Sequence, residues 1–381
     1  MNLQLIKYFD RYLGIPLCYI LKFFDYLPSW KNNNKIKKIL LAKFSGFGNI
    51  VLALPSIRAV RKKYPNAEIV FITHTINKSV VEKEPSINRV ITFDVNGALE
   101  TFMNILYLIK KLRKENFDLI IDFEQFSRFS AVIFFLSGAR IKVGFNTPRQ
   151  GRGILYDIKV PYEEKHTSQI FKNMVSAVGS RVDMNDSKIF ITSNDKEKIN
   201  DFLKKNKVKE TDILIGIHPG CGANNPQRKW PKKNFAKLSD FLIENYNVRI
   251  FFTGSNSEKN IIQEIMSMMK HPSLDTSGLF NLRELAYIIS KCRIFFSNDT
   301  GPLHIASAMK IPVAAFFGPN TPALYGPLGN NNLVFYKKLK CSPCTTNFNE
   351  KTTKCKHFKC IKTITFEEVR DSIKKLNILS K

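Results

Sequence analysis

The segment of residues 297–304, Ser-Asn-Asp-Thr-Gly-Pro-Leu-His, contains side chains that could hold a charged ligand. It follows an apolar run and precedes a predicted helix. Gly301 would let a ligand approach the main chain closely, and the free N–H groups at the start of a helix favour an anion such as a diphosphate. Asp299 and Thr300 could contact this ligand or could cap the helix. The segment therefore predicts an anion-binding loop.

Three more loops follow apolar runs in the same half of the chain. They are residues 218–225, which continue to Arg228, Lys229, Trp230 and Pro231; Gly254 and Ser255 with Glu258; and residues 317–321. Glycines and two cations make the first loop suitable for a pyrophosphate, because Arg and Lys side chains pair with phosphate oxygens. Glu258 could accept hydrogen bonds from ribose hydroxyls, or it could cap a helix.

The elements that must position these loops follow a regular order. Apolar runs alternate with helical patterns, which predicts α/β architecture with parallel sheets covered by helices. The predicted strands are residues 39–44, 69–73, 90–93, 119–123, 213–218, 248–253, 294–298 and 313–317. A polar, charged stretch over residues 193–211 separates two series, so we expect Rossmann-like domains over residues 38–195 and 196–381. Ligands of such sheets bind outside the carboxyl ends of the strands, where the loops named above lie.

The composition limits the kinds of partner. The 381-residue chain has 59 Lys and Arg against 32 Asp and Glu, a formal net charge of +27. This charge attracts nucleic acid, anionic lipid or phosphorylated substrates. The sequence lacks a basic run interleaved with aromatic residues, so nucleic acid is not expected as a partner. A cleavable signal peptide is not recognisable after Met1, which predicts a cytoplasmic location.

Residues 1–37 form a predicted segment of their own, ending in the linker residues 32–34. Residues 12–24 are largely apolar, with Lys22 among them. This stretch is too short to cross a hydrocarbon core, which needs about 20 residues. It fits an amphipathic segment lying in a membrane interface, or a helix packed on the protein's own surface. The positive charge favours contact with an anionic membrane surface, so we expect a peripheral protein on the inner face of the cytoplasmic membrane.

Four of the seven cysteines lie close together in the sequence: Cys341, Cys344, Cys355 and Cys360. Their spacing is compatible with a structural zinc site. Reversible disulfides and unligated thiols are the alternatives.

The motifs together resemble those of glycosyltransferase family 9, which includes the ADP-heptose:lipopolysaccharide heptosyltransferases. The resemblance extends from about Lys38 to the C-terminus, and it rests on residues 45–55, 118–122, 218–220, 229–231, 299–302, His304 and 317–319. It implies the GT-B fold, in which two Rossmann-like domains face each other across a cleft. It also implies inverting transfer of a sugar from a nucleotide-diphosphate sugar to a lipopolysaccharide-core-like or lipid-linked glycan, without a catalytic cofactor.

The resemblance implies a donor site in the C-terminal domain and an acceptor site in the N-terminal domain. The expected donor-binding residues are His218, Gly220, Arg228, Lys229, Gly254, Glu258, Asp299, Thr300, Gly301, Pro302, His304, Gly318 and Pro319. Residues 299–301 and His304 would hold the diphosphate, with Arg228 or Lys229 paired to it, and Glu258 would bind the ribose. The expected acceptor-binding residues are Ser45, Gly46, Gly48 and Arg128.

One position departs from the family's pattern. Members with established heptosyl transfer usually carry Asp where this chain has Asn49, and that Asp is the presumed general base. An amide cannot take a proton from the acceptor hydroxyl. We therefore expect Glu124, just past a predicted strand, to be the base and Asn49 to position the acceptor. Arg128 could orient Glu124 or bind an acceptor phosphate, or the two could simply pair on one helix face.

Two other classes of function fit the same features. Some nucleotide-sugar epimerases use this two-domain fold, so the chain could be a nucleotide-sugar hydrolase or epimerase. Asn49 also suggests a non-catalytic nucleotide-sugar-binding protein that has lost its base.

Overall fold

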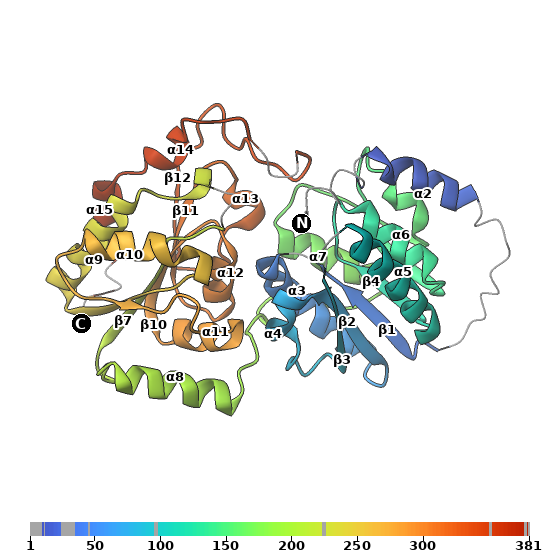
Figure 1. The fold of residues 1–381 in the computed structure, drawn as a ribbon, viewed down its shortest axis with the longest axis horizontal. Coiled ribbons are helices and arrows are strands. Elements are labelled where there is room, and N and C mark those ends of the chain that lie inside the picture. Colours follow the sequence, from blue (N-terminus) through green and yellow to red (C-terminus); the bar gives the residue numbers. More distant parts are fainter. Residues whose placement is uncertain are drawn as a thin grey trace. The chain divides into compact units, whose positions relative to one another are not determined.

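The computed structural model describes residues 10, 12–23, 35–44, 46–94, 98–222, 226–349, 353–376 and 379, without the side chains of residues 98–102. The chain divides into two compact units, residues 1–186 and 187–381 (Figure 1). The domain limit expected at 195/196 falls inside helix α8 (Ser193–Lys205), which begins after the N-cap Thr192. Two compact units are thus present, and the polar stretch between the two strand series is a helix of the second unit.

The N-terminal unit contains a six-stranded parallel sheet in the order β3-β2-β1-β4-β5-β6. Its strands are β1 (Lys38–Ala42), β2 (Glu68–His74), β3 (Arg89–Phe93), β4 (Leu119–Asp122), β5 (Ile141–Asn146) and β6 (Ile158–Pro161). The helices between them are α3 (Phe47–Lys63), η2 (Thr75–Asn77), α4 (Lys78–Val81), α5 (Ala98–Glu115), α6 (Arg128–Leu136), η3 (Arg152–Leu155) and α7 (Thr167–Ser176).

Helices cover the N-terminal sheet, which explains why its central strands are apolar runs. Leu40 and Ala42 of β1 lie in one core cluster with Leu108 of α5 and Phe134 of α6. Helices α3 and α7 pack against each other. The ring of Phe171 in α7 makes an edge-to-face contact with the phenylalanine that follows β4. The strands predicted from residues 39–44, 69–73, 90–93 and 119–123 are confirmed as β1 to β4.

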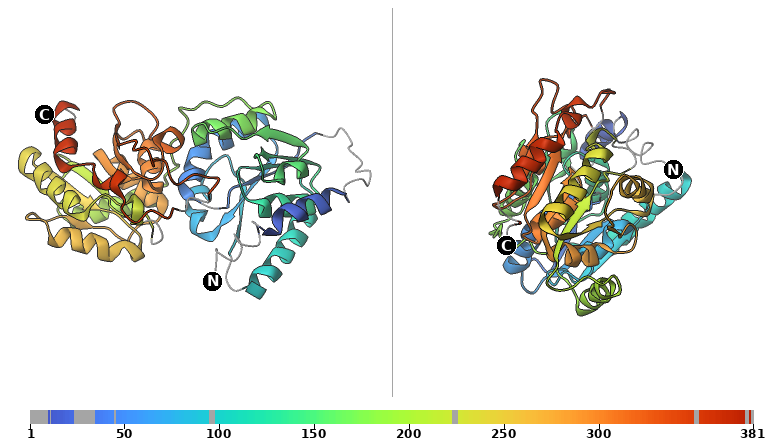
Figure 2. Two further views of the ribbon diagram at one scale, coloured as in Figure 1. Left: turned by 90° about the horizontal axis from the view of Figure 1, so that it is seen from above. Right: turned by 90° about the vertical axis from the view of Figure 1, so that its left-hand side faces the viewer.

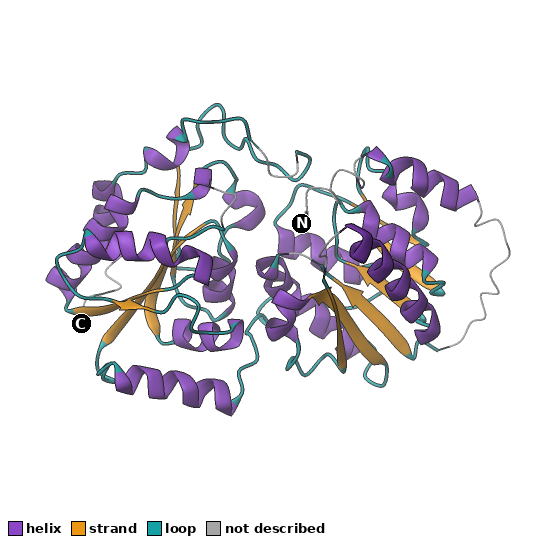
Figure 3. Cartoon of the chain, in the orientation of Figure 1, coloured by secondary structure: helices purple, strands orange, loops and turns teal. Residues whose placement is uncertain are grey.

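The C-terminal unit contains a second parallel sheet, whose strands are drawn in orange in Figure 3. It has six strands in the order β12-β11-β10-β7-β8-β9. Its strands are β7 (Ile213–His218), β8 (Val248–Phe252), β9 (Leu274–Asp275), β10 (Cys292–Asn298), β11 (Val313–Phe317) and β12 (Leu333–Tyr336). The helices after α8 are η4 (Pro226–Arg228), α9 (Lys232–Tyr246), η5 (Asn256–Glu258), α10 (Lys259–Ser267), α11 (Leu282–Ser290), α12 (Gly301–Ala308), α13 (Pro322–Tyr325), α14 (Lys359–Lys362) and α15 (Phe366–Leu376).

An aromatic cluster forms the centre of the C-terminal core. Trp230 stacks on Phe316 of β11 with ring centroids 4.3 Å apart, and Phe235 of α9 meets both rings edge-on. The Trp230 indole N–H donates to the carbonyl of Ile364, just before α15. The end of the chain is thereby joined to the loop that precedes α9.

Each sheet has one point at which the strand order reverses. In the N-terminal sheet this point lies between β1 and β4, and in the C-terminal sheet it lies between β7 and β10. The loops leaving two such strands diverge to opposite faces and open a crevice, which is the usual ligand position in open α/β sheets. We call these places the N-terminal and C-terminal switch points.

Helix α2 (Gly14–Phe23) is the part of the N-terminal segment that the structure describes most fully. It packs against α6 and η3 (Figures 1 and 2), and the Cys18 side chain is fully buried there. One of the alternatives drawn from the sequence, packing on the protein's own surface, therefore describes one side of this helix. Among the described residues, no helix combines the length and apolar character needed to cross a membrane.

Candidate functional site

The four loops predicted to hold a donor follow four neighbouring strands. Strands β11, β10, β7 and β8 are consecutive in the sheet and run parallel, so their carboxyl ends share one edge. His218 ends β7, Asn298 ends β10, and Gly254 and Gly318 stand just past β8 and β11. The fold thus brings together, along one edge of the sheet, segments up to 100 residues apart in the chain.

The start of α12 lies directly after β10 and is built by Thr300, Gly301 and Pro302. Thr300 is the N-cap residue, with extended backbone, and its side chain makes no capping hydrogen bond. Asp299, the residue before it, accepts a hydrogen bond from Asn320 Nδ2 at 2.8 Å. Of the two roles that the sequence left open for Thr300, helix capping is therefore not the one that its side chain takes here. The amide groups at the start of α12 form an N-terminus suited to an anion.

Arg228 lies beside Asp299, the residue that precedes this helix start. Its guanidinium lies 3.5 Å from the Asp299 carboxylate and 3.4 Å from the Asp299 carbonyl. Both distances are long for charged hydrogen bonds, and the buried Arg228 Nε finds no partner within the described residues. A buried donor without a partner is rare in folded proteins, and a bound anion would supply one to this guanidinium.

Asn298 fixes the loops around the C-terminal switch point, a role that the sequence did not indicate. Its side-chain oxygen accepts the backbone N–H of Trp230 at 3.0 Å, and its side-chain nitrogen donates to the carbonyl of Pro219 at 2.8 Å. The residue is fully buried. One amide side chain therefore joins the loop after β7, the turn before α9 and the end of β10.

Glu258 completes a capping box at η5, in which it and Ser255 exchange hydrogen bonds. Its other carboxylate oxygen accepts the N–H of Gly222 at 2.9 Å. A side chain at Gly220 would place its Cβ 2.1 Å from this carboxylate, so the close approach requires glycine. Burial alone would raise the pKa of Glu258, but His218 and the hydrogen bonds from the Ser255 and Gly222 amides outweigh burial and lower it. The capping alternative is thus realised, and ribose binding stays a prediction.

His218 is buried beside Glu258, and its Nδ1 lies 2.9 Å from the carbonyl of Thr253. Because a carbonyl only accepts, Nδ1 carries the proton. Burial lowers the pKa of His218.

The remaining predicted donor residues occupy the same edge of the sheet. His304 is buried in the first turns of α12, and its ring centroid lies 6.4 Å from that of Tyr325. The carbonyl of Pro319 accepts the amide groups of Cys344 and Thr345, each at 2.9 Å. Pro319 therefore anchors the cysteine-containing segment to the end of β11.

The N-terminal switch point contains an ion pair that the sequence did not reveal. Lys43 follows β1 and Glu124 follows β4, and Lys43 Nζ lies 2.7 Å from one Glu124 oxygen. The other oxygen accepts the backbone N–H of Phe44 at 2.7 Å. Both side chains are almost fully buried, with 2% of Lys43 and 10% of Glu124 exposed. Each oxygen of the Glu124 carboxylate therefore has a partner.

Arg128 lies at the start of α6 and has other partners. Its guanidinium contacts Asp10 at 3.1 Å and the carbonyl of Gln150 at 3.0 Å. The cation that the structure brings to Glu124 is Lys43, in place of the Arg128 that the sequence suggested. Arg128 instead joins α6 to the start of the N-terminal segment.

A fully buried network supports the strand that precedes Glu124. Asp122 contacts Arg152 at 2.7 Å and Ser130 at 2.6 Å, and it accepts from the Tyr156 hydroxyl at 2.5 Å. Arg152 also donates to the Glu124 carbonyl. These contacts fix the backbone around Glu124.

The turn after β1 was predicted to bind an acceptor. Ser45 lies outside the described residues. Gly46 has a φ of 79°, which favours glycine, and its carbonyl accepts the N–H of Asn49 at 2.8 Å. Gly48 is buried in α3, and Asn49 is half-buried in the first turn of that helix.

The cysteine segment does not show the predicted zinc site. Among the described residues, which include all four of its cysteines, no three His, Cys, Asp or Glu side chains are grouped closely enough to hold a metal ion. Burial raises the pKa of Cys360 to about 11, with smaller contributions from Cys344, Cys341 and Cys355.

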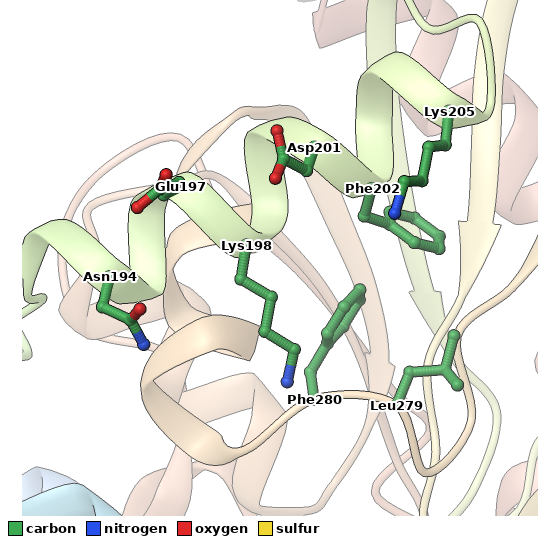
Figure 4. Close-up of a pocket in the computed structure, with 8 residues that line it drawn as sticks. All are labelled: Asn194, Glu197, Lys198, Asp201, Phe202, Lys205, Leu279 and Phe280. Carbon is green, nitrogen blue, oxygen red and sulfur yellow. The ribbon is translucent and has the colours of Figure 1, made fainter.

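A pocket of about 540 Å³ lies between α8 and the turn at Leu279 and Phe280 (Figure 4). The rings of Phe202 and Phe280 meet edge-on in it, 5.0 Å apart, and Glu197 and Asp201 line its charged side. None of its lining residues belongs to the predicted donor set.

A family model, related sequences and related structures all indicate the same protein family. The family model described as glycosyltransferase family 9 (heptosyltransferase) matches residues 105–356. A lipooligosaccharide heptosyltransferase 2 from Campylobacter jejuni is 25% identical over 362 residues, covering 94% of this chain and 99% of that protein. A glycosyl transferase family 9 structure from Veillonella parvula has a TM-score of 0.75 at 20% identity, with 91% of this chain and 98% of that chain covered.

The structure of E. coli ADP-heptose LPS heptosyltransferase II has a TM-score of 0.71 at 17% identity, with 89% of this chain and 98% of that chain covered. The likeness to these structures confirms the predicted GT-B fold. Because the family model matches more than half of the sequence, the chain belongs to glycosyltransferase family 9, the heptosyltransferase family, and is a glycosyltransferase.

Proposed function

We propose that this glycosyltransferase moves a heptose from ADP-heptose onto a sugar of the lipopolysaccharide core or of a related lipid-linked glycan. The names of its relatives support the choice of sugar and nucleotide. The observation that carries the proposal is the start of α12 at the C-terminal switch point, where the Thr300 side chain makes no cap and Arg228 lies beside Asp299. These groups suit the diphosphate of a nucleotide sugar.

The C-terminal unit would bind the donor. The amide groups at the start of α12 would contact the diphosphate, with the Thr300 hydroxyl as a further donor and Arg228 or Lys229 as the paired cation. Glu258, whose carboxylate is already held by Ser255 and Gly222, would accept from the ribose hydroxyls.

The N-terminal unit would bind the acceptor, with Glu124 as the general base and Asn49 as a positioning residue. Lys43 and the Phe44 amide each hold one oxygen of the Glu124 carboxylate. The acceptor hydroxyl would have to lie within hydrogen-bond reach of this carboxylate for it to act as a base.

The proposed reaction is a single displacement. The acceptor oxygen forms a bond to the anomeric carbon while the bond from that carbon to the diphosphate oxygen breaks. ADP leaves with the electron pair, and the hydroxyl proton passes to Glu124. Attack opposite the leaving group inverts the anomeric carbon. Arg228, Lys229 and the start of α12 would stabilise the charge that develops on ADP, so the proposed step includes no metal ion. A structural zinc ion in the cysteine segment stays a separate prediction, which metal analysis of the purified protein tests.

The proposed role of Thr300 gives a direct test. In Thr300→Val the shape is kept and the hydroxyl is lost. We expect ADP affinity to fall about 3- to 10-fold, the effect of one hydrogen bond, while the melting temperature stays unchanged because the hydroxyl caps nothing. Titration calorimetry with ADP and thermal unfolding measure the two effects. Unchanged affinity with lowered stability would show a structural hydroxyl and would contradict the proposal.

A second experiment separates transfer from hydrolysis and epimerisation. The protein is incubated with ADP-heptose alone, and with ADP-heptose plus a lipopolysaccharide acceptor that lacks the terminal heptose. We expect ADP release that depends on the acceptor and a product with the inverted anomeric linkage. Release of ADP or a new epimer without acceptor would support the other classes of function.

A further inference from the structure

Helix α2 is apolar on the side that packs against the protein. Cys18 is fully buried in a cluster with Ala131 of α6 and with Leu155 and Tyr156 at η3. A side chain at Gly14 would place its Cβ 2.6 Å from the Arg128 side chain, so the helix approaches α6 closely. These contacts hold α2 on the N-terminal unit and fix which side faces outward.

The outward side of α2 is also apolar. Its large exposed side chains are Tyr12 and Leu13, which precede the helix, and Leu17, Tyr19, Ile20 and Phe23, which are 40–74% exposed. Positions 13, 17 and 20, and positions 12, 19 and 23, recur at helical spacing, so apolar side chains line most of the outer surface. The helix sequence GIPLCYILKF contains a single charged residue, Lys22. A helix on a water-exposed surface normally carries polar residues there.

Helix α5 continues this surface on the other side of α6. Its exposed residues Met103, Leu106 and Tyr107 are 47–68% exposed. The next turns present Lys110, Arg113 and Lys114 to solvent. Both α2 and α5 pack against α6, and both lie on the same side of the N-terminal sheet in Figures 1 and 2. Apolar side chains thus adjoin a basic group of residues on one surface.

We propose that α2 and α5 form a membrane-docking face, whose apolar side chains enter the interface of a bilayer while Lys110, Arg113 and Lys114 contact anionic lipid headgroups. The charge identifies the partner: anionic lipid complements the basic end of α5, and tyrosines are favoured at the boundary between headgroups and hydrocarbon. The chain's net charge of +27 acts in the same direction. The inference deepens the membrane position expected from the sequence, and it rests on the proposed function only for its lipid-linked acceptor.

The docking face adjoins the N-terminal switch point. Arg128, which opens α6, contacts Asp10 of the N-terminal segment at 3.1 Å, and the Phe129 amide donates to the same carboxylate at 2.6 Å. Glu124 lies only four residues before Arg128. A bilayer bound by α2 would therefore lie near the proposed acceptor site, as transfer to a lipid-anchored glycan requires.

The experiment measures binding of the full chain to vesicles by flotation. One set of vesicles contains phosphatidylcholine alone, and the other contains phosphatidylcholine mixed with phosphatidylglycerol. We expect binding to the anionic vesicles that weakens with added salt. The outer-face variant Leu17→Ser/Ile20→Ser/Phe23→Ser should lower the partition coefficient by at least about tenfold, and Lys110→Glu/Lys114→Glu should lower it on the anionic vesicles alone.

The control variant is Ile76→Ser/Phe190→Ser, which changes two apolar residues that are 82% and 44% exposed elsewhere. It should bind vesicles like the wild type. ADP affinity and transfer to a detergent-solubilised acceptor should be unchanged in all variants, so a failure of the proposed function would be seen separately. Equal vesicle binding by the wild type and the outer-face variant would overturn the proposal. So would a wild-type dimer that the outer-face variant converts to a monomer, because the face would then be a protein interface.

Discussion

The two switch points present different kinds of chemical group. At the N-terminal one, Lys43 and Glu124 meet as a buried ion pair between side chains. At the C-terminal one, the groups offered to a ligand are chiefly backbone amides at the start of α12, with Arg228 beside them. A surface of amides holds a charged group in one fixed geometry, as a donor diphosphate needs. A side-chain pair can exchange one partner for a substrate, as a proton acceptor needs.

The largest expected effect on either switch point comes from removing the proposed base. Glu124→Gln keeps the shape and can still accept from Phe44, but it cannot take a proton. We expect kcat to fall about 10²- to 10⁴-fold, the usual contribution of a general base, with ADP affinity unchanged because the donor groups lie in the other unit. Steady-state kinetics and calorimetry measure both. Asn49→Ala, as the comparison variant, should reduce kcat less, and a near-normal rate for Glu124→Gln would remove Glu124 from the mechanism.

Removing the cation of the Lys43–Glu124 pair should lower the stability of the protein. Lys43→Met leaves a buried carboxylate without its cation, which costs about 3–5 kcal/mol in buried pairs. Urea unfolding measures the loss. Lys165→Met is the matched control, because Lys165 and Glu163 form an exposed pair, 60% and 44% accessible, worth at most about 1 kcal/mol. Equal effects of the two substitutions would mean that the N-terminal switch point does not depend on its ion pair.

The C-terminal switch point should respond to Arg228→Ala in ligand binding. Loss of one charged hydrogen-bonding group weakens the binding of an anion by about 1.5–3 kcal/mol, which lowers ADP affinity roughly 10- to 100-fold. Lys205→Ala, in the pocket beside α8, serves as the control and should leave ADP affinity unchanged. If both variants bind ADP like the wild type, the anion site lies elsewhere.

The smallest expected effect concerns pH. Burial lowers the pKa of His218 from its ordinary value of 6.5, so the unfolded chain binds a proton more readily than the folded one. Stability from this group is therefore present above pH 6.5 and falls as the pH drops below it. His218→Gln should flatten the decline in melting temperature below about pH 6.5.

The sequence predicted most of the strands, and the positions of the loops proposed to bind the donor, because the signals for apolar strands are local. Apolar runs buried on both faces identify β1, β4, β7 and β10, and each donor loop follows directly after such a run. The strands β5, β6, β9 and β12 were not predicted. β5 contains Lys142 and Gly144, and β9 spans only two residues, so neither shows a clear apolar pattern. β6 and β12 span only four residues each.

The contacts that the sequence could not supply join residues far apart in the chain. Lys43 and Glu124 meet only because β1 and β4 are neighbours in the sheet. Asn298 stands in a recognised motif, but its partners Trp230 and Pro219 come from another strand's loop. Glu258 was assigned to a ribose or to a cap, and only the fold brings the Gly222 amide to it. Long-range pairing of this kind has no short-range signature.

Through Trp230, the loops around the C-terminal switch point depend on a residue that is synthesised late. Its indole N–H is satisfied by Ile364, while its backbone N–H holds Asn298 and so the loops around the switch point. An indole donor buried without its acceptor costs about 1–3 kcal/mol. A nascent chain that has not yet released residue 364 from the ribosome lacks that acceptor. The growing polypeptide should therefore become able to bind a nucleotide only late in its synthesis. Removing C-terminal residues that include Ile364 should likewise weaken nucleotide binding at a site about 60 residues upstream.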